Sequence, residues 1–304
     1  MKELLITGAW QCTAEQADAL RDLGYHITFW PDERKPVDLD TSLFEAVICG
    51  GLFLTTPIER FSALRCVQLT SAGTDRVPMA YCKAHGITVY NAGGVYSAPM
   101  AEFVLCGILQ LYKETAFFTK NQAAHRWEKH RGLRELGGKT ACIVGTGSVG
   151  SAIARRLQAF EVRTVGVNRH GCTASSFDAI YTVDQLDEVL PLADFVICAM
   201  PLTAETNRLF NAKRFERIKA GAVFVNVARG KIAEESALVA ALQTGHLSGA
   251  VLDVFEDEPL SADSPLWDMQ QVVLTPHNSF VGEQNSRRLF VCIQEHLYEQ
   301  SKEG

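Results

Sequence analysis

The fold of the chain is decided by residues 141–150, which read Ala141-Cys142-Ile143-Val144-Gly145-Thr146-Gly147-Ser148-Val149-Gly150. The first four residues are apolar, as in a buried strand, and glycines follow at the first, third and sixth places of a turn. Behind the turn, apolar side chains recur at helical spacing, at Val149, Ile153, Ala154 and Leu157. The stretch therefore predicts a strand that passes through a glycine turn into a helix over residues 148–160.

Each glycine has a physical reason in a turn that binds a dinucleotide. Gly145 permits a tight turn, Gly147 lets a pyrophosphate approach the backbone, and Gly150 lets the helix lie close to the strand. The pyrophosphate then lies at the helix N-terminus, where free N–H groups and the helix dipole favour an anion. We expect residues 145–150 to bind a dinucleotide; an ordinary glycine-rich turn is the alternative.

Composition limits the class of protein. Hydrophobic residues make up 47% and charged residues 21%, which is typical of a soluble globular enzyme, and a formal net charge of −6 argues against a nucleic-acid partner. The nine cysteines contain no CxxC pair, so we expect core thiols in a reducing compartment and no metal site. The N-terminal apolar run is too short for a signal peptide, and no membrane span is expected. These features predict a cytoplasmic protein.

Apolar β-like runs recur at regular intervals, which is the rhythm of a parallel α/β sheet. Before the glycine turn they are Leu4–Thr7, His26–Phe29, Ala46–Cys49, Cys66–Thr70 and Thr88–Asn91. From the turn onward they are Ala141–Val144, Arg163–Val167, Phe195–Ala199, Ala222–Val227, Gly249–Val254 and Gln271–Thr275. We predict two doubly wound parallel α/β domains, a dinucleotide-binding domain over residues 96–281 and a substrate domain over residues 1–95 and 282–304.

The segment from Tyr96 to about Lys120 predicts one long helix that is apolar nearly all round. Ser97 is the expected N-cap, and Pro99 fits the first turn. Because such a helix must be covered on both sides, we expect it to lie between the two domains and in a homodimer interface. A last helix over residues 283–301 returns the chain to the first domain.

The order of the motifs resembles that of the D-isomer-specific 2-hydroxyacid dehydrogenases along nearly the whole chain. The motifs are Ser71-Ala72-Gly73-Thr74-Asp75, Ala101-Glu102-Phe103, the glycine turn, Pro201-Leu202-Thr203-Ala204-Glu205-Thr206, Asn226-Val227-Ala228-Arg229-Gly230, Asp253-Val254-Phe255-Glu256-Asp257-Glu258-Pro259 and Thr275-Pro276-His277. The resemblance implies a Rossmann cofactor domain inserted into a flavodoxin-like substrate domain. It also implies an enzyme that reduces a 2-keto acid to the D-2-hydroxy acid with hydride from NAD(P)H.

Arg229 and His277 each follow a predicted strand, at the end where α/β sheets bind ligands. The planar guanidinium of Arg229 suits a substrate carboxylate and can polarise the adjacent ketone, although a surface arginine at a strand end is the alternative. His277 can protonate the developing alkoxide, and a neighbouring carboxylate would stabilise its imidazolium. The resemblance assigns catalysis to Arg229, Glu258 and His277. Glu256 and Asp257 carry the same charge, and only the family pattern of an acid before proline selects Glu258.

The resemblance also implies the ligand contacts. The backbone N–H groups of Ala72 and Gly73 would bind the substrate carboxylate, together with Arg229 and His277. Asp253 would bond the nicotinamide carboxamide. The remaining implied cofactor contacts are Pro201, Thr206 and Ala228.

Cofactor choice depends on the end of the strand that follows the glycine turn. NAD enzymes carry an acid there, whereas this chain has Val167-Asn168-Arg169-His170, and no Asp or Glu occurs from Val162 through Phe177. Arg169 would attract a 2′-phosphate, and Asn168 could hydrogen-bond it. The sequence favours NADP(H), with NAD(H) as the alternative.

Within the family we expect glyoxylate or hydroxypyruvate reduction by a homodimer. One alternative is an NAD-dependent dehydrogenase of a bulkier 2-hydroxy acid; another is a dinucleotide-sensing regulatory protein, although a sensor needs no proton donor. Gly51-Leu52-Phe53-Leu54 forms either an apolar wall for the substrate side chain or ordinary packing. After His277 the chain runs Asn278-Ser279-Phe280-Val281-Gly282, where many family members have small apolar residues and then a threonine, so the shape of the substrate pocket stays open.

Overall fold

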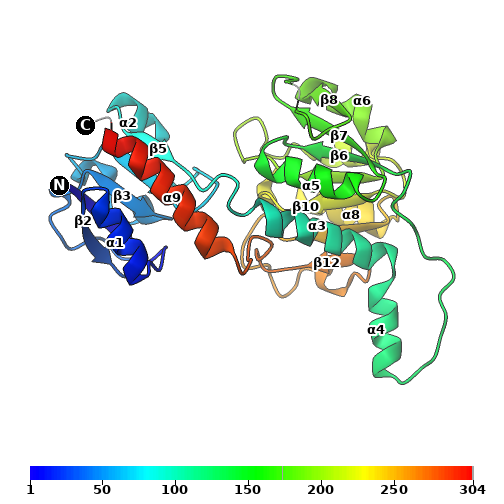
Figure 1. Ribbon diagram of the computed structural model, residues 1–304. Coiled ribbons are helices and arrows are strands. Elements are labelled where there is room, and N and C mark those ends of the chain that lie inside the picture. Colours follow the sequence, from blue (N-terminus) through cyan, green and yellow to red (C-terminus); the bar gives the residue numbers. More distant parts are fainter. Residues whose placement is uncertain (173, 303–304) are drawn as a thin grey trace. The chain divides into compact units, whose positions relative to one another are not determined.

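The structure is a computed structural model that describes residues 1–172 and 174–302. It divides into two compact units (Figure 1). Unit 1 comprises Met1–Tyr96 and Gly282–Gly304, and unit 2 comprises Ser97–Val281. None of the helices within the described ranges combines the length and the apolar character that a bilayer crossing requires.

Unit 1 is built on a five-stranded parallel sheet in the order β2-β1-β3-β4-β5. Its strands are β1 (Lys2–Thr7), β2 (Tyr25–Trp30), β3 (Ala46–Cys49), β4 (Cys66–Leu69) and β5 (Thr88–Tyr90). Its helices are α1 (Ala14–Asp22), α2 (Met79–Ala84) and α9 (Asn285–Lys302). This strand order is that of flavodoxin-like folds, whose ligands bind at the junction of β1 and β3.

Both faces of the unit 1 sheet are buried, because side chains alternate along each strand. On one face, Leu4 and Ile6 join a core with Leu20 of α1 and with Ile293 and Leu297 of α9. On the other face, a second core is formed by Leu5, Val47, Val67 and Cys82, among others. Figure 1 shows α1 and α9 lying over the sheet, so the C-terminal helix completes the N-terminal unit.

Unit 2 is built on a seven-stranded parallel sheet in the order β12-β11-β10-β9-β6-β7-β8. Its strands are β6 (Thr140–Val144), β7 (Arg163–Asn168), β8 (Ala179–Thr182), β9 (Phe195–Cys198), β10 (Val223–Asn226), β11 (Gly249–Leu252) and β12 (Val272–Leu274). Its helices are α3 (Ser97–Tyr112), α4 (Thr115–Ala123), α5 (Ser148–Gln158), α6 (Leu186–Val189), α7 (Ala212–Arg217) and α8 (Glu235–Gln243). Helices α3 and α5 pack on one face and α6, α7 and α8 on the other. The order is that of a doubly wound nucleotide-binding sheet, so the predicted fold class is confirmed.

Short 3₁₀ turns occur in both units, at Thr41–Leu43, Leu52–Leu54, Ile58–Arg60, Val183–Gln185, Leu190–Leu192, Gly230–Ile232 and Pro265–Asp268. The turn at Leu52–Leu54 follows the carboxyl end of β3, and that at Gly230–Ile232 follows the carboxyl end of β10. Both therefore lie at the sheet edge where α/β proteins bind ligands.

Three details differ from the sequence predictions. A seventh strand, β8, is present in unit 2; it is an edge strand with only half-buried residues, so it lacks the apolar run that marks a central strand. The long helix predicted to about Lys120 is broken at Glu114, which adopts a left-handed conformation with φ 50° between α3 and α4. Ser97 does not act as an N-cap, because its buried hydroxyl has no hydrogen-bond partner among the described residues.

Candidate active site and dinucleotide turn

The glycine turn connects β6 to α5 at the point where the strand order of unit 2 reverses. Gly145 has φ +106°, and a Cβ there would lie 2.5 Å from the backbone of Ala199. A Cβ on Gly150 would lie 1.9 Å from the carbonyl oxygen of Gly145. Gly145 and Gly150 are therefore required because any larger residue would clash with backbone atoms of this chain.

Gly147 differs, because a Cβ there would meet no atom within 4 Å among the described residues other than its chain neighbours. It is the N-cap of α5, and this helix start has no side-chain cap hydrogen bond within the described residues. The absence of a side chain at Gly147 thus leaves open space beside unsatisfied N–H groups. This arrangement fits the pyrophosphate of a dinucleotide, which would bind where a Cβ would otherwise stand.

Asn168 is the last residue of β7, next to this turn, and Arg169 follows it. The Nδ2 of Asn168 donates to Thr146 Oγ1 and to the carbonyl oxygen of Cys172, each at 3.0 Å. Asn168 thus braces its own loop, and its contact with a 2′-phosphate stays a prediction. Arg169 is 65% exposed and lies 3.7 Å from a carboxylate oxygen of Glu205.

The loop after β9 carries the next group of predicted cofactor residues. The hydroxyl of Thr206 donates to the carbonyl oxygen of exposed Pro201 at 2.8 Å and accepts from the N–H of Thr203 at 2.7 Å. Thr206 therefore closes the loop internally. Ala228 is buried, and its carbonyl oxygen accepts from Nη1 of Arg229 at 2.8 Å.

Arg229 lies just beyond the carboxyl end of β10, where the sequence places it. The buried Asn226 holds this corner, because its Nδ2 donates to the carbonyl oxygen of Arg229 at 3.0 Å and its Oδ1 accepts from the N–H of Ala228 at 3.1 Å. A Cβ on Gly230 would lie 1.8 Å from the backbone of Phe255. Asn226 was not predicted as a site residue, although an amide at a buried strand end is a signal for such a cap.

His277 and Glu258 form the central pair of the candidate site. The distance between His277 Nδ1 and Glu258 Oε2 is 2.9 Å, and their side chains are 36% and 38% exposed. The second oxygen of Glu258 accepts from the N–H of Phe255 at 3.1 Å, which fixes the carboxylate. Of the two rival acids, Glu256 lies 3.7 Å from Arg208 instead. The acid that contacts His277 is thus Glu258.

Asp253 is the residue predicted to contact the nicotinamide. It is fully buried directly after β11, and its Oδ1 accepts from the hydroxyl of Thr275 at 2.6 Å and from the N–H of Asn278 at 2.7 Å. Its Oδ2 accepts from the N–H of Ser279 at 2.9 Å. These bonds hold the loop that carries His277, and the contact of Asp253 with the nicotinamide stays a prediction.

The predicted substrate loop of unit 1 follows β4. The carbonyl oxygen of Ala72 accepts from Nδ2 of Asn91 at 2.8 Å, and that of Gly73 accepts from the hydroxyl of Ser71 at 2.9 Å. Within the described residues, the N–H groups of Ala72 and Gly73 donate to no protein acceptor. These donors are left for a ligand, as in an anion-binding nest.

No group of three or more His, Cys, Asp or Glu side chains within the described residues is placed to hold a metal ion. All nine cysteines are free, and burial raises the pKa of the Cys142 thiol to about 12, so this residue behaves as a core side chain.

Known proteins share these features. Residues 105–279 match the family described as D-isomer specific 2-hydroxyacid dehydrogenase, NAD binding domain. Over 247 residues the chain is 36% identical to glyoxylate/hydroxypyruvate reductase B of Salmonella schwarzengrund, a match that covers 79% of this chain and 76% of that protein.

Two solved structures extend the likeness to both units. A D-isomer specific 2-hydroxyacid dehydrogenase family protein from Aeromonas salmonicida subsp. salmonicida shows 31% sequence identity and a TM-score of 0.77, covering 94% of this chain and 92% of that one. A D-isomer specific 2-hydroxyacid dehydrogenase from Xanthobacter autotrophicus, in complex with NADPH and MES, shows 27% identity and a TM-score of 0.80, covering 100% of this chain and 95% of that one.

Proposed function

The chain belongs to the D-isomer specific 2-hydroxyacid dehydrogenase family and is an NAD(P)-dependent enzyme, and we propose that it reduces a small 2-keto acid of the glyoxylate or hydroxypyruvate type to the D-2-hydroxy acid. The observation that carries the proposal is the 2.9 Å contact between His277 and Glu258. These residues follow β12 and β11, and Arg229 follows the adjacent strand β10. A proton donor, its carboxylate partner and a guanidinium thus share one sheet edge.

The contact between His277 and Glu258 determines which proton of His277 is transferred to the substrate. Glu258 accepts a hydrogen bond from the Nδ1–H of His277, so the proton available to substrate is the one on Nε2 of the imidazolium. As the ketone carbon is reduced, this proton passes to the carbonyl oxygen, and the neutral histidine keeps its Nδ1–H on Glu258. When bound, a nicotinamide cofactor would supply the hydride for the ketone carbon.

The substrate carboxylate needs donors of its own. We assign this task to the guanidinium of Arg229 and to the backbone N–H groups of Ala72 and Gly73, which have no acceptor among the described residues. The carbonyl of Ala228 orients Nη1 of Arg229 at 2.8 Å. A planar fork held in this way can bond a carboxylate and the adjacent ketone oxygen together.

NADP(H) is the proposed cofactor, with NAD(H) as the alternative. The proposal is supported by the exposed guanidinium of Arg169 at the end of β7 and by the NADPH bound in the Xanthobacter relative. We assign the pyrophosphate to the turn of residues 145–150, where Gly147 leaves open space beside the N-terminus of α5.

The experiment is cofactor oxidation by the full chain with glyoxylate, hydroxypyruvate and pyruvate, using NADPH and NADH in parallel. We expect His277→Ala to lower kcat by roughly two to four orders of magnitude while NADPH still binds, because a general acid contributes about that much. Glu258→Gln, which keeps the shape of the side chain but not its charge, should cost about one to two orders of magnitude. His26→Ala is the matched control, since His26 pairs with Glu3 on the surface of unit 1.

Three results would contradict the proposal or a part of it. Tight dinucleotide binding without turnover of any 2-keto acid would favour the nucleotide-sensing alternative. Turnover only of substrates with long side chains, with NADH, would favour the dehydrogenase of bulkier acids. A wild-type rate for His277→Ala would remove that residue from the reaction.

A further inference from the structure

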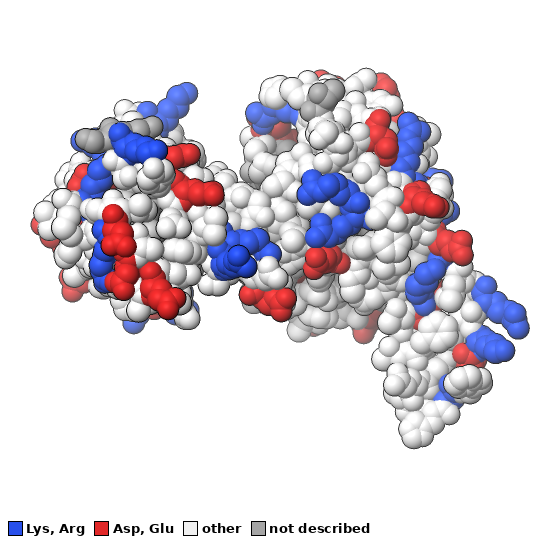
Figure 2. Space-filling model, in the orientation of Figure 1, with Lys and Arg blue, Asp and Glu red and all other residues white. Residues whose placement is uncertain are grey.

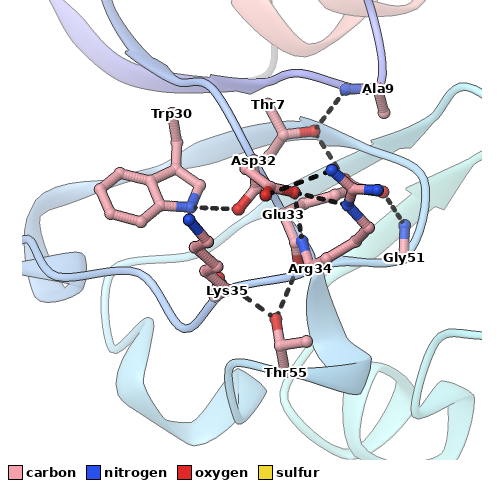
Figure 3. A network of polar contacts seen from close by, with 9 residues as sticks. All are labelled: Thr7, Ala9, Trp30, Asp32, Glu33, Arg34, Lys35, Gly51 and Thr55. Atoms are coloured by element: carbon pink, nitrogen blue, oxygen red, sulfur yellow. Dashed lines mark hydrogen bonds and ion pairs between the residues drawn. The ribbon is translucent and has the colours of Figure 1, made fainter.

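The carboxylate of Glu33 is enclosed at the carboxyl ends of the strands of unit 1 (Figure 3). Its Oε2 accepts from the hydroxyl of Thr7 at 2.7 Å and from the N–H of Gly50 at 3.0 Å. Its Oε1 accepts from the N–H of Gly51 at 2.6 Å. The carbonyl oxygen of Glu33 also accepts from the hydroxyl of Thr55 at 2.7 Å. One residue thus binds both ends of the segment that follows β3.

This position is the switch point of the sheet. Thr7 ends β1 and Gly50 follows β3, and these neighbouring strands are the pair at which the strand order reverses. Flavodoxin-like sheets bind ligands at this point, and exposed N–H groups there attract anions. In this chain an internal carboxylate already occupies those donors. The site is therefore closed to a substrate anion. In the next loop, the N–H groups of Ala72 and Gly73 donate to no acceptor among the described residues.

Within the described residues, the cation next to Glu33 in sequence does not pair with the Glu33 carboxylate, which therefore bonds only the groups named above. The adjacent cation, Arg34, donates from Nε to Oδ1 of Asp32 at 2.8 Å, and the indole N–H of Trp30 donates to the carbonyl oxygen of Asp32 at 3.0 Å. The loop is thus braced by its own side chains. Charge-assisted bonds of a carboxylate to N–H and O–H groups are among the stronger hydrogen bonds in proteins.

The segment held by Glu33 packs against the predicted substrate loop. A Cβ on Gly50 would lie 3.1 Å from Thr70 Oγ1, and a Cβ on Gly51 would lie 3.5 Å from Leu54 Cδ1 and 3.8 Å from Arg76 Cδ. Leu52 is fully buried and anchors the segment, whereas the side chain of Leu54 is 69% exposed. An apolar side chain is therefore presented beside the loop of residues 70–76.

We propose that Glu33 is a positioning residue that fixes the segment Gly51–Leu54 as the wall facing the substituent on the ketone carbon of the substrate. The inference rests on the proposed 2-keto acid reduction, which assigns the substrate carboxylate to Ala72 and Gly73, in the loop of unit 1 that lies beside this segment. Glyoxylate carries only hydrogen there and cannot touch the wall. Pyruvate and 2-ketobutyrate carry a methyl and an ethyl group.

The test compares KM and kcat for glyoxylate, pyruvate and 2-ketobutyrate in the full-length enzyme with saturating cofactor. We expect Glu33→Ala to raise KM for 2-ketobutyrate by about tenfold, with a smaller rise for pyruvate, while KM for glyoxylate and all kcat values stay within about twofold. Glu33→Gln should recover part of the effect, since its one amide oxygen can still accept from Gly51. Asp38→Ala removes an exposed acid of the same region and is the control.

Equal changes for all three substrates, or no change, would overturn the inference while leaving the proposed function intact. An inactive wild-type enzyme would instead contradict the proposed function. In that case amide hydrogen exchange still tests whether Glu33 fixes the segment. The N–H groups of Gly50 and Gly51 should exchange faster in Glu33→Ala than in Asp38→Ala. If Glu33→Ala does not fold, Thr7→Val, which removes one donor to the carboxylate, serves the same comparisons. Unchanged exchange would reject the role.

Discussion

The N–H of His277 donates to the carbonyl oxygen of Asp253 at 2.8 Å, and the buried side chain of Asp253 holds the residues on either side of it. His277 has φ 51°, a left-handed conformation that a residue with a side chain adopts only when its surroundings impose it. The imidazole is thus aimed by a strand end that lies far from it in sequence.

Asp253→Asn should therefore weaken the loop and the reaction together. Its amide would turn a donor toward the N–H of Ser279, which leaves a buried donor unsatisfied at a cost of about 1–3 kcal/mol. We expect lower kcat, a lower Tm and unchanged dinucleotide affinity, with Thr275→Val showing a smaller effect because it removes one donor only. A large loss of dinucleotide affinity at unchanged Tm would instead support the predicted contact of Asp253 with the cofactor.

The glycines of the turn make separable predictions. Gly147→Ala should leave the free energy of unfolding within about 0.5 kcal/mol of wild type, because no atom lies within 4 Å of the new Cβ, but it should abolish tight dinucleotide binding. Gly150→Ala should destabilise unit 2 by roughly 1–3 kcal/mol, since its Cβ would lie 1.9 Å from a backbone oxygen. Thermal unfolding and calorimetric titration with NADPH distinguish them. Normal binding by Gly147→Ala would refute the assignment of the pyrophosphate.

Cofactor preference should depend on the pair formed by Arg169 and Glu205. The hydroxyl of Thr203 and the charge of Arg169 lower the pKa of Glu205, so this acid is ionised at neutral pH and competes with a 2′-phosphate for the guanidinium. We expect Arg169→Ala to weaken NADPH binding by about tenfold, and Glu205→Gln to strengthen it by about twofold to fivefold. NADH binding should change in neither variant. Arg163→Ala, at the opposite end of β7, is the control, and an equal effect on NADH would contradict the role of the 2′-phosphate.

We expect the stability of the protein to depend on pH through Glu235, the first residue of α8. Burial raises the pKa of Glu235, and the charges of Glu256 and Asp257 add to this, against an opposing hydrogen bond from the N–H of Glu256. The folded state therefore binds the proton more tightly than the unfolded state, and the free energy of unfolding falls as the pH rises above the ordinary value of 4.5.

Glu235→Gln should consequently be more stable than wild type at neutral pH and equal to it below the ordinary pKa. Urea unfolding at both pH values measures the difference. Glu234→Gln, one residue earlier at the same helix end, is the control and should show no such pH-dependent gain. Equal stability of wild type and Glu235→Gln at neutral pH would show that the buried charge is fully compensated.

On the face shown in Figure 2, acidic and basic side chains are interspersed over both units. The formal net charge of the chain is −6.

Local sequence patterns were sufficient to predict the two parallel sheets and the glycine turn. They were also sufficient to place Arg229, Glu258 and His277 after strand ends. Hydropathy periodicity marks a central strand because both of its faces are buried, and it fails for the edge strand β8, whose residues are half-buried. The break at Glu114 was missed because helix-forming residues continue on both sides of it.

The sequence by itself determined the fold class and the residue types that can carry out the reaction, because both depend on hydropathy and chemistry read along the chain. The family pattern selected Glu258, and the tertiary structure brings this acid to His277. Only the tertiary structure decided that Asp253 holds the loop around His277 and that Glu33 fills the switch point of unit 1. Each of these contacts joins residues that are 17 to 26 positions apart and follow the carboxyl ends of strands of one sheet. The parallel strands bring those ends together, and hydrogen-bond geometry then selects among side chains of equal charge.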